Sequence, residues 1–291
     1  MSKVWWLVVS GWLLVGCATA VPPSQLAPII SPTHHPTTRS ITPAPTSTSL
    51  SASLLPSPPA PTPLPDTGWQ SLQPGLERRV ITLLDEAERP YESLYLLRLE
   101  PDQFRFEIAY QPGAPKSLLE WQAATGALIV INGGFFTEAN EAIGLTAVDG
   151  QASGISFVDF GGMLAITEAG PEIRWLVERP YTPGEPLQYA LQSFPMLVKP
   201  GGVLGYPDED GSPARRTVIG MDGNGRFLII LTRRSNFTLH QLSAWLVASD
   251  LGLDVALNLD GGSSSGLILA NPREELLPFV LLPAVITIYP R

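Results

Sequence analysis

The composition changes abruptly near residue 67, and this change confines any folded core to the rest of the chain. Between residues 21 and 66, Pro, Ser and Thr dominate, aromatic residues are absent and charged residues are nearly absent. Such a segment buries too little apolar surface to offset the chain entropy lost on folding, and its prolines favour an extended spacer. We therefore expect residues 17–67 to form a disordered stalk and residues 68–291 to form one folded domain.

The N-terminal residues have the pattern of an export signal. Lys3 precedes an apolar run, residues 4–15, that is too short for a membrane span and is typical of a signal-peptide core. The run ends in Leu-Val-Gly-Cys, which resembles the lipobox of bacterial lipoproteins. We therefore expect residues 1–16 to be a signal peptide and Cys17, the only cysteine of the sequence, to carry a lipid anchor in the cell envelope, outside the cytoplasm. The alternative is an ordinary secretory signal followed by a chance cysteine.

The charge balance limits the possible partners. The formal net charge is −9, and no basic stripe occurs anywhere in the sequence. Nucleic acid is therefore not expected as a partner. An anionic substrate would need a local positive site on this acidic protein, which directs attention to individual arginines.

Apolar periodicity predicts more strands than helices. Strands are expected over residues 76–83, 93–99, 103–110, 127–131, 255–259 and 284–289. Two hairpins are expected, residues 146–148 with 155–158 and residues 216–221 with 226–231. Helices are expected from Ser117 to Thr125 and from the N-cap Thr238 to Gly252. This mixture predicts an α+β domain built on one large mixed β-sheet with a few flanking helices.

Two glycine corners of similar design follow two of the buried strands. The first is Asn132-Gly133-Gly134-Phe135-Phe136, and the second is Asp260-Gly261-Gly262-Ser263-Ser264. Paired glycines allow positive φ and a close approach of backbone to a ligand, and consecutive N–H groups at such a turn can bind an anion. The alternative is that both corners are tight turns chosen for backbone geometry alone.

Three ordered motifs give the chain a specific resemblance. They are the Asn-Gly-Gly corner, Arg216-Thr217-Val218-Ile219-Gly220, and the strand that leads into the Asp-Gly-Gly corner. Together they resemble the signature blocks of the phosphodiester glycosidase family, and the resemblance extends from about residue 76 to residue 289. Two positions depart from the family pattern, since Ser263 stands where a third glycine is usual and Val218 stands where alanine is usual.

The resemblance implies hydrolysis of the bond between a sugar C1 and a phosphodiester. The leaving group is a phosphate monoester with a second pKa of about 6, so it needs little help from a general acid. Asp260 is the candidate nucleophile or base, and Arg216 is the candidate phosphate clamp, a role that Arg215 could also fill. Asn132 is expected to contact a sugar hydroxyl or an oxyanion.

Further residues of the motifs are expected to bind substrate. They are Gly133, Gly134, Phe135, Thr217, Gly261, Gly262, Ser263 and Ser264. Serine catalysis is disfavoured because it needs a base, and His240 is the only histidine after the stalk. No cofactor and no metal in the site are expected, because no Cys/His cluster or calcium-loop spacing occurs, although structural Ca²⁺ stays open.

The sequence therefore predicts a hydrolase that cleaves a sugar-1-phosphodiester, of the GlcNAc-1-phosphodiester kind, in envelope or extracellular glycans. The alternative is a non-catalytic lipoprotein that binds saccharide or scaffolds the envelope. The sequence names neither the sugar and its anomer nor the group beyond the phosphate.

Overall fold

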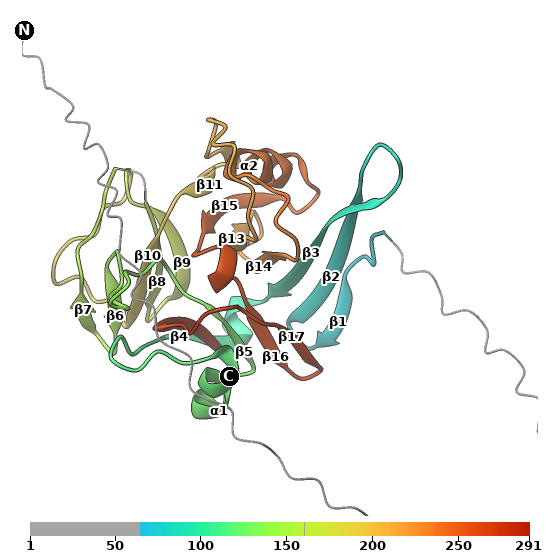
Figure 1. Cartoon of the computed structure of the whole chain (residues 1–291). Helices are drawn as coiled ribbons and strands as arrows, with labels where there is room; N and C mark the ends of the chain where they lie inside the picture. Colours follow the sequence, from blue (N-terminus) through green and yellow to red (C-terminus); the bar gives the residue numbers. More distant parts are fainter. Residues whose placement is uncertain (1–64, 160) are drawn as a thin grey trace, which may run out of the picture. The chain divides into compact units, whose positions relative to one another are not determined.

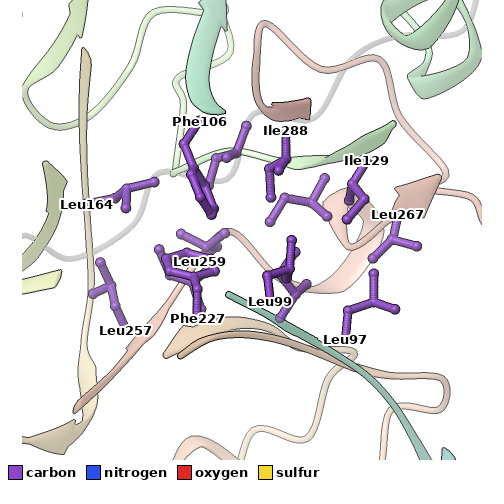
Figure 2. Close-up of a cluster of buried hydrophobic side chains, with 14 of the residues drawn as sticks. Leu97, Leu99, Phe106, Ile129, Leu164, Phe227, Leu257, Leu259, Leu267 and Ile288 are labelled. Atoms are coloured by element: carbon purple, nitrogen blue, oxygen red, sulfur yellow. The ribbon is translucent and has the colours of Figure 1, made fainter. Parts of the chain in front are cut away.

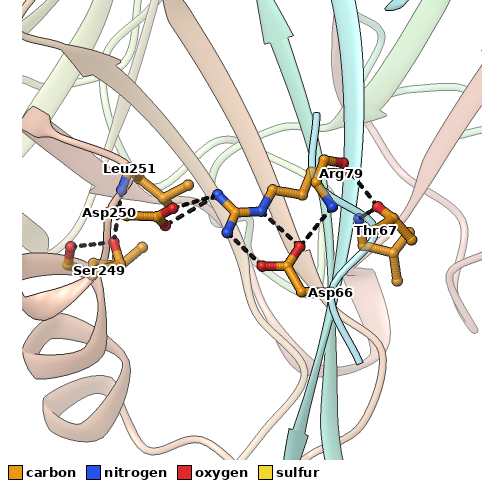
Figure 3. Close-up of polar contacts among 9 residues, drawn as sticks. Asp66, Thr67, Arg79, Ser249, Asp250 and Leu251 are labelled. Atoms are coloured by element: carbon orange, nitrogen blue, oxygen red, sulfur yellow. Dashed lines mark hydrogen bonds and ion pairs between the residues drawn. The ribbon is translucent and has the colours of Figure 1, made fainter. Parts of the chain in front are cut away.

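The computed structural model describes residues 65–159 and 161–291. The expected signal peptide, Cys17 and the expected stalk up to residue 64 lie outside the described residues. Residues 65 and 66, which precede the expected domain boundary, contact the domain, since Pro65 O accepts from Thr82 N at 2.5 Å. Arg79, on strand β2 (Leu76–Leu84), donates from Nε to Asp66 at 2.9 Å and from Nη1 to Asp250 at 2.9 Å (Figure 3). Arg79 thereby links Asp66 to strand β2 of the domain.

Three β-sheets make up the described domain (Figure 1). The first has the order β1 (Gln70–Gln73), β2, β3 (Pro90–Leu99), β14 (Phe227–Thr232), β13 (Thr217–Asp222), β15 (Leu253–Asn258), β11 (Met196–Lys199) and β12 (Val203–Leu204). The second has the order β7 (Gln151–Ser153), β6 (Thr146–Val148), β10 (Tyr189–Ser193), β8 (Gly162–Thr167) and β9 (Gly170–Trp175). The third has the order β17 (Arg273–Leu276), β16 (Leu267–Ala270), β5 (Ile129–Asn132), β18 (Ala284–Pro290) and β4 (Phe104–Tyr110).

The expected fold class was only partly right. The described domain is mainly β, and its strands pair antiparallel in three sheets rather than in one large mixed sheet. The continuous apolar runs of β5 and β15 do mark strands buried on both faces. That burial comes from facing sheets and from helices, and not from the crossover helices of a parallel sheet.

One hydrophobic core joins the three sheets. It contains Leu97 and Leu99 of β3, Leu257 of β15, Leu164 of β8 and Ile288 of β18, together with neighbouring side chains (Figure 2). Side chains from the first sheet therefore meet side chains from the other two in a common interior. This shared interior fixes the strand ends of different sheets relative to one another, which matters for the site described below.

Both expected helices are present. Helix α1 (Leu118–Thr125) begins with a capping box between Ser117 and Glu120 and ends at Gly126, whose φ is 66°. Helix α2 (Leu239–Ala248) begins at Thr238 with a second capping box. It ends at Ala248, before the expected Gly252, which instead takes a φ of 63° in the turn before β15. Among the described residues, no helix has the length and apolar character needed to span a membrane.

The apolar pattern located the strands well where a turn signal was clear. The hairpin β13–β14 was predicted almost to the residue, and the strands at 76–84, 90–99, 104–110 and 284–290 were predicted within a few residues. In the other hairpin the second arm was wrong, because β6 pairs with residues 151–153. Asp149 and Gly150 both have positive φ, as a two-residue turn requires, so the partner strand starts at once.

Candidate functional site

The two glycine corners, which come from different sheets, meet in space. Asn132 ends β5 of the third sheet, whereas Asp260 follows β15 of the first sheet. Asp260 N donates to Gly133 O at 3.2 Å, and Asn132 Nδ2 donates to Asp260 O at 2.8 Å. The residues that the sequence motifs singled out are therefore brought to one place by the packing of two sheets.

Asn132 uses its polar atoms to hold the corners together. Its Oδ1 accepts from Thr217 Oγ1 at 2.8 Å and from Gly266 N at 3.0 Å. Its Nδ2 donates to Gly133 O at 3.2 Å as well as to the Asp260 carbonyl. Asn132 and Thr217 are both fully buried. In this geometry the two side chains position the backbone of the corners and do not face a ligand.

The glycines of the corners are needed mainly for close backbone packing. A Cβ would lie 2.9 Å from Ala284 O at Gly133, 2.8 Å from Gln192 O at Gly134 and 2.9 Å from Arg215 O at Gly261. Among the four glycines of the two corners, only Gly262 has a positive φ, which is 58°. The N–H groups of Gly133, Gly261 and Gly262 donate to protein oxygens. These three amides therefore do not form the anion-binding nest that the sequence suggested.

Asp260 carries a partly buried carboxylate at the end of β15. Its Oδ1 accepts from Gly261 N at 2.9 Å. Burial raises the pKa of Asp260, and hydrogen bonds from the Ser264 side chain and the Gly261 N–H oppose the increase. The carboxyl group therefore takes up a proton at a higher pH than an ordinary aspartate does.

Arg216 directly precedes strand β13 and lies beside the Asp-Gly-Gly corner. Val218 pairs with Asn258, and Leu259 N donates to Thr217 O at 2.8 Å. The next hydrogen bond runs from Gly262 N, and not from Gly261 N, to Arg215 O at 2.8 Å, so the regular register ends at the corner. A Cβ at Gly261 would lie 3.8 Å from Arg216 Nη1, so the guanidinium reaches the Asp-Gly-Gly corner.

The Arg216 guanidinium is buried and forms no ion pair with any residue of the described range. Its Nη2 donates to Ser212 O at 2.6 Å, and its Nε donates to Phe237 O at 3.4 Å. Burial lowers the pKa of Arg216, which is only 8% exposed. A buried cation whose hydrogen bonds go only to carbonyls retains its capacity to bind an anion.

A pocket of about 670 Å³ opens beside Arg216. Phe135 and Phe194 stack in its wall with ring centroids 4.3 Å apart, and Asn258 Nδ2 donates to Phe194 O at 2.9 Å. Its lining consists of Phe135, Asp159, Trp175, Phe194, Pro195, Met196, Lys199, Gly205, Tyr206, Pro207, Asp208, Arg216, Leu239 and Asn258. The pocket therefore combines aromatic walls with cationic, carboxylate and amide groups, as small-molecule sites often do.

The pocket distinguishes between the two arginines that the sequence left open. Arg216 lines it, whereas Arg215 points to the other side of the corner and donates to Ser265 O at 2.8 Å. A second pocket of about 770 Å³ is lined by none of the predicted site residues. Because function depends on the groups that converge in a site and not on its volume, we assign the candidate site to the pocket at Arg216.

Several residues of this pocket were not predicted from the sequence. Trp175, Phe194, Lys199 and Tyr206 lie between residues 161 and 206, where no motif was found. Asn258 could have been predicted from the sequence, because it is a polar residue within an otherwise apolar buried strand. It is 1% exposed, and its Oδ1 has no hydrogen-bond partner among the described residues.

The remaining residues considered from the sequence are the serines of the Asp-Gly-Gly corner and His240. Ser264 is buried beside Asp260, and Ser263 is exposed at the tip of the corner. His240 contacts Tyr206 O through Nδ1 at 3.1 Å, and no hydrogen bond joins it to a serine of the corner. Within residues 65–159 and 161–291, no three His, Cys, Asp or Glu side chains form a cluster suited to a metal ion.

The fold of the chain is similar to the folds of solved protein structures. The catalytic domain of zebrafish N-acetylglucosamine-1-phosphodiester alpha-N-acetylglucosaminidase, auto-inhibited by its pro-peptide, matches with a TM-score of 0.60 at 15% identity, over 76% of this chain and 86% of that one. A hypothetical protein from Synechocystis matches with a TM-score of 0.52 at 14% identity, over 75% of this chain and 62% of that one. At such identities the likeness concerns the fold.

No curated protein sequence matches the chain significantly. The model of the phosphodiester glycosidase family matches residues 125–279, a range that contains both glycine corners and the Arg-Thr motif between them. Since this match spans more than half of the sequence, the chain belongs to the phosphodiester glycosidase family.

Proposed function

We propose that the chain is an enzyme that hydrolyses a sugar-1-phosphodiester, of the GlcNAc-1-phosphodiester kind, in an envelope or extracellular glycan. The observation that carries the proposal is the Arg216 guanidinium, which is buried, donates only to carbonyl oxygens and lines a pocket next to the Asp-Gly-Gly corner. Asp260 is not among the residues that line the pocket. Membership of the phosphodiester glycosidase family and the shared fold with the zebrafish enzyme support the same reaction class.

The proposed roles follow from position. Arg216 binds the phosphate, because its planar fork matches two phosphate oxygens. Phe135 and Phe194 offer an apolar wall to a sugar ring. Asp260 attacks the sugar C1 or takes a proton from an attacking water. Overall, one water is consumed, and the products are the free sugar and a phosphate monoester, which leaves readily at neutral pH.

The Asn132 side chain enters this proposal as a positioning group. Its hydrogen bonds to the Asp260 carbonyl and to Thr217 fix the Asp-Gly-Gly corner against β5. Preorganised geometry of this kind accounts for a large part of enzymatic rate enhancement, because the reacting groups need no reorganisation during the reaction.

Release of free sugar by the purified full chain tests the proposal. The substrates are a GlcNAc-1-phosphomethyl compound and UDP-GlcNAc, and free GlcNAc is quantified. The wild-type chain should release GlcNAc from at least one of them, whereas Asp260→Asn should bind the compound without releasing sugar. Equal binding of several saccharides by the wild type without any release would favour the non-catalytic saccharide-binding lipoprotein instead.

A further inference from the structure

A second arginine, Arg215, is attached to both ends of the Asp-Gly-Gly corner. Its carbonyl oxygen accepts from Gly262 N at 2.8 Å, and its Nη2 donates to Ser265 O at 2.8 Å. The short 3₁₀ helix of the corner, η2 (Gly262–Ser264), thus lies between two attachment points on the same residue. Arg215 therefore limits the movement of the residues that directly follow Asp260.

The segment after β17 holds the corner from another side. Phe279 N donates to Ser263 O at 2.7 Å, and Arg215 Nη1 donates to Leu277 O at 3.2 Å. The Phe279 ring lies over the Arg215 guanidinium at 5.2 Å, although the residue is 79% exposed. We call Arg215, Leu277 and Phe279 the Arg215 clamp. Its contacts lead to the corner and not to the hydrophobic core.

The Arg215 clamp has a free-energy cost that its contribution to stability alone does not explain. Arg215 is buried, forms no ion pair in the described part of the chain, and has no hydrogen-bond partner at Nε. Burial lowers the pKa of Arg215. Burying a cation without an anion costs free energy. A planar guanidinium can nevertheless donate to two separate carbonyls in fixed directions, which a lysine ammonium does not do with the same rigidity.

We propose that Arg215 is a positioning residue, which clamps the Asp-Gly-Gly corner and so holds Asp260 in place. The inference rests on the proposed function, in which Asp260 and Arg216 carry the reaction. The Arg215 guanidinium donates to Leu277 O and Ser265 O, so it acts through the corner and not on the substrate. Proteins accept locally unfavourable groups where function needs them, and a buried unpaired cation that holds the corner after Asp260 fits that pattern.

Steady-state kinetics of the full chain separate positioning from substrate binding. Arg215→Met keeps the apolar stem and removes the fork, and Phe279→Leu removes the ring at an exposed position where folding is not at risk. A misplacement of about 1 Å costs on the order of 10²-fold in rate. We expect kcat of Arg215→Met to fall by about that factor with KM nearly unchanged, a smaller fall for Phe279→Leu, and partial rescue of Arg215→Ala by added guanidinium.

The matched control is Arg89→Met, since the Arg89 side chain is 77% exposed and far from the corner in sequence. It should leave kcat and KM as in the wild type. An increase of KM at constant kcat in Arg215→Met would mean that Arg215 binds substrate. An unchanged kcat per folded molecule would mean that its role is structural. Either result would overturn the proposal.

Hydrogen exchange tests the clamp without any turnover. In Arg215→Met, amides in a peptide covering residues 259–267 should exchange faster than in the wild type and in Arg89→Met, while β13 and β14 keep their protection. Unchanged exchange in that peptide would refute the clamp. If the exchange changes as expected but the wild type hydrolyses no sugar phosphodiester, the proposed function fails and the clamp stands.

Discussion

Asp260 belongs to the Asp-Gly-Gly corner that the Arg216 guanidinium reaches, yet neither residue forms an ion pair in the described part of the chain. Arg216 is buried and Asp260 is partly buried, so both carry a desolvation cost, which the charge of Asp210 partly offsets for Arg216. Such an arrangement weakens the folded state but leaves both groups free to act on a substrate. At the residue scale, the site is therefore best probed through the charges of these two side chains.

Replacing the Asp260 carboxylate should reduce activity and increase stability together. In Asp260→Asn, kcat should fall by about 10²–10⁴-fold, as expected for loss of a general base or nucleophile. The neutral amide avoids the cost of burying a charge, so the variant should melt at a higher temperature than the wild type at pH 7. Thermal unfolding and sugar release measure the two effects, and a lower melting temperature would contradict the assignment of a desolvated carboxylate.

The pH dependence follows from the raised pKa of Asp260. The folded state holds the Asp260 proton at pH values where the unfolded chain has lost it, so stability falls as pH rises from the ordinary aspartate pKa through the raised one. Asp260→Asn should lose this part of the pH dependence. Activity should rise over the same window, since the ionised form reacts. An acid limb of kcat/KM at or below the ordinary aspartate pKa would argue against Asp260.

Removing the Arg216 fork should impair catalysis selectively. Arg216→Gln keeps a hydrogen-bonding side chain without the charge, and we expect kcat/KM to fall by about 10²–10³-fold, the typical effect of losing one charge-stabilising donor. Arg89→Gln, at an exposed position, serves as the control. Competition by inorganic phosphate provides a second readout, since phosphate should inhibit the wild type and not Arg216→Gln. Equal inhibition of both proteins would place the phosphate elsewhere.

At the scale of elements, the Asn-Gly-Gly corner depends on how closely β5, β10 and β18 approach each other. Gly133 packs against Ala284 of β18, and Gly134 packs against Gln192 of β10. Neither glycine needs positive φ, so the constraint is the lack of room for a Cβ. The Asn-Gly-Gly corner therefore lies at the junction of the second and third sheets, and close tertiary packing there requires its glycines.

A single methyl group should disturb this junction. In Gly134→Ala, the Cβ would lie 2.8 Å from Gln192 O, and relieving that contact should destabilise the fold by about 1–3 kcal/mol. Gly113→Ala is the matched control, because a Cβ at Gly113 meets no heavy atom within 4 Å. Urea denaturation of both variants measures the difference. Equal stabilities would show that the backbone at Gly134 yields without cost.

For the whole molecule, we propose that the chain is exported and held at the envelope by a lipid on Cys17, beyond the described residues. The sequence pattern around residues 4–17 supports the proposal. In a bacterial host, the wild type should incorporate a radiolabelled fatty acid and sediment with membranes, whereas Cys17→Ser should do neither. Export of an unlabelled wild-type protein would favour an ordinary secretory signal instead.

Local patterns in the sequence determined the elements that depend on near neighbours. Capping boxes fixed the starts of both helices, and turn residues fixed the β13–β14 hairpin, because these signals act within a few residues of the chain. The ordered motifs also identified the family, since the Arg-Thr motif and both corners lie within the matched range.

Only the tertiary structure decided which residues share the pocket and how the strands are divided among sheets. Strands buried on both faces look alike whether a helix or another sheet covers them, so three antiparallel sheets could not be distinguished from one mixed sheet. Phe194 and Trp175 enter the pocket through contacts between segments distant in sequence, and no local signal marks them. The same packing turned Asn132 inward and left Arg216, not Arg215, open to the pocket.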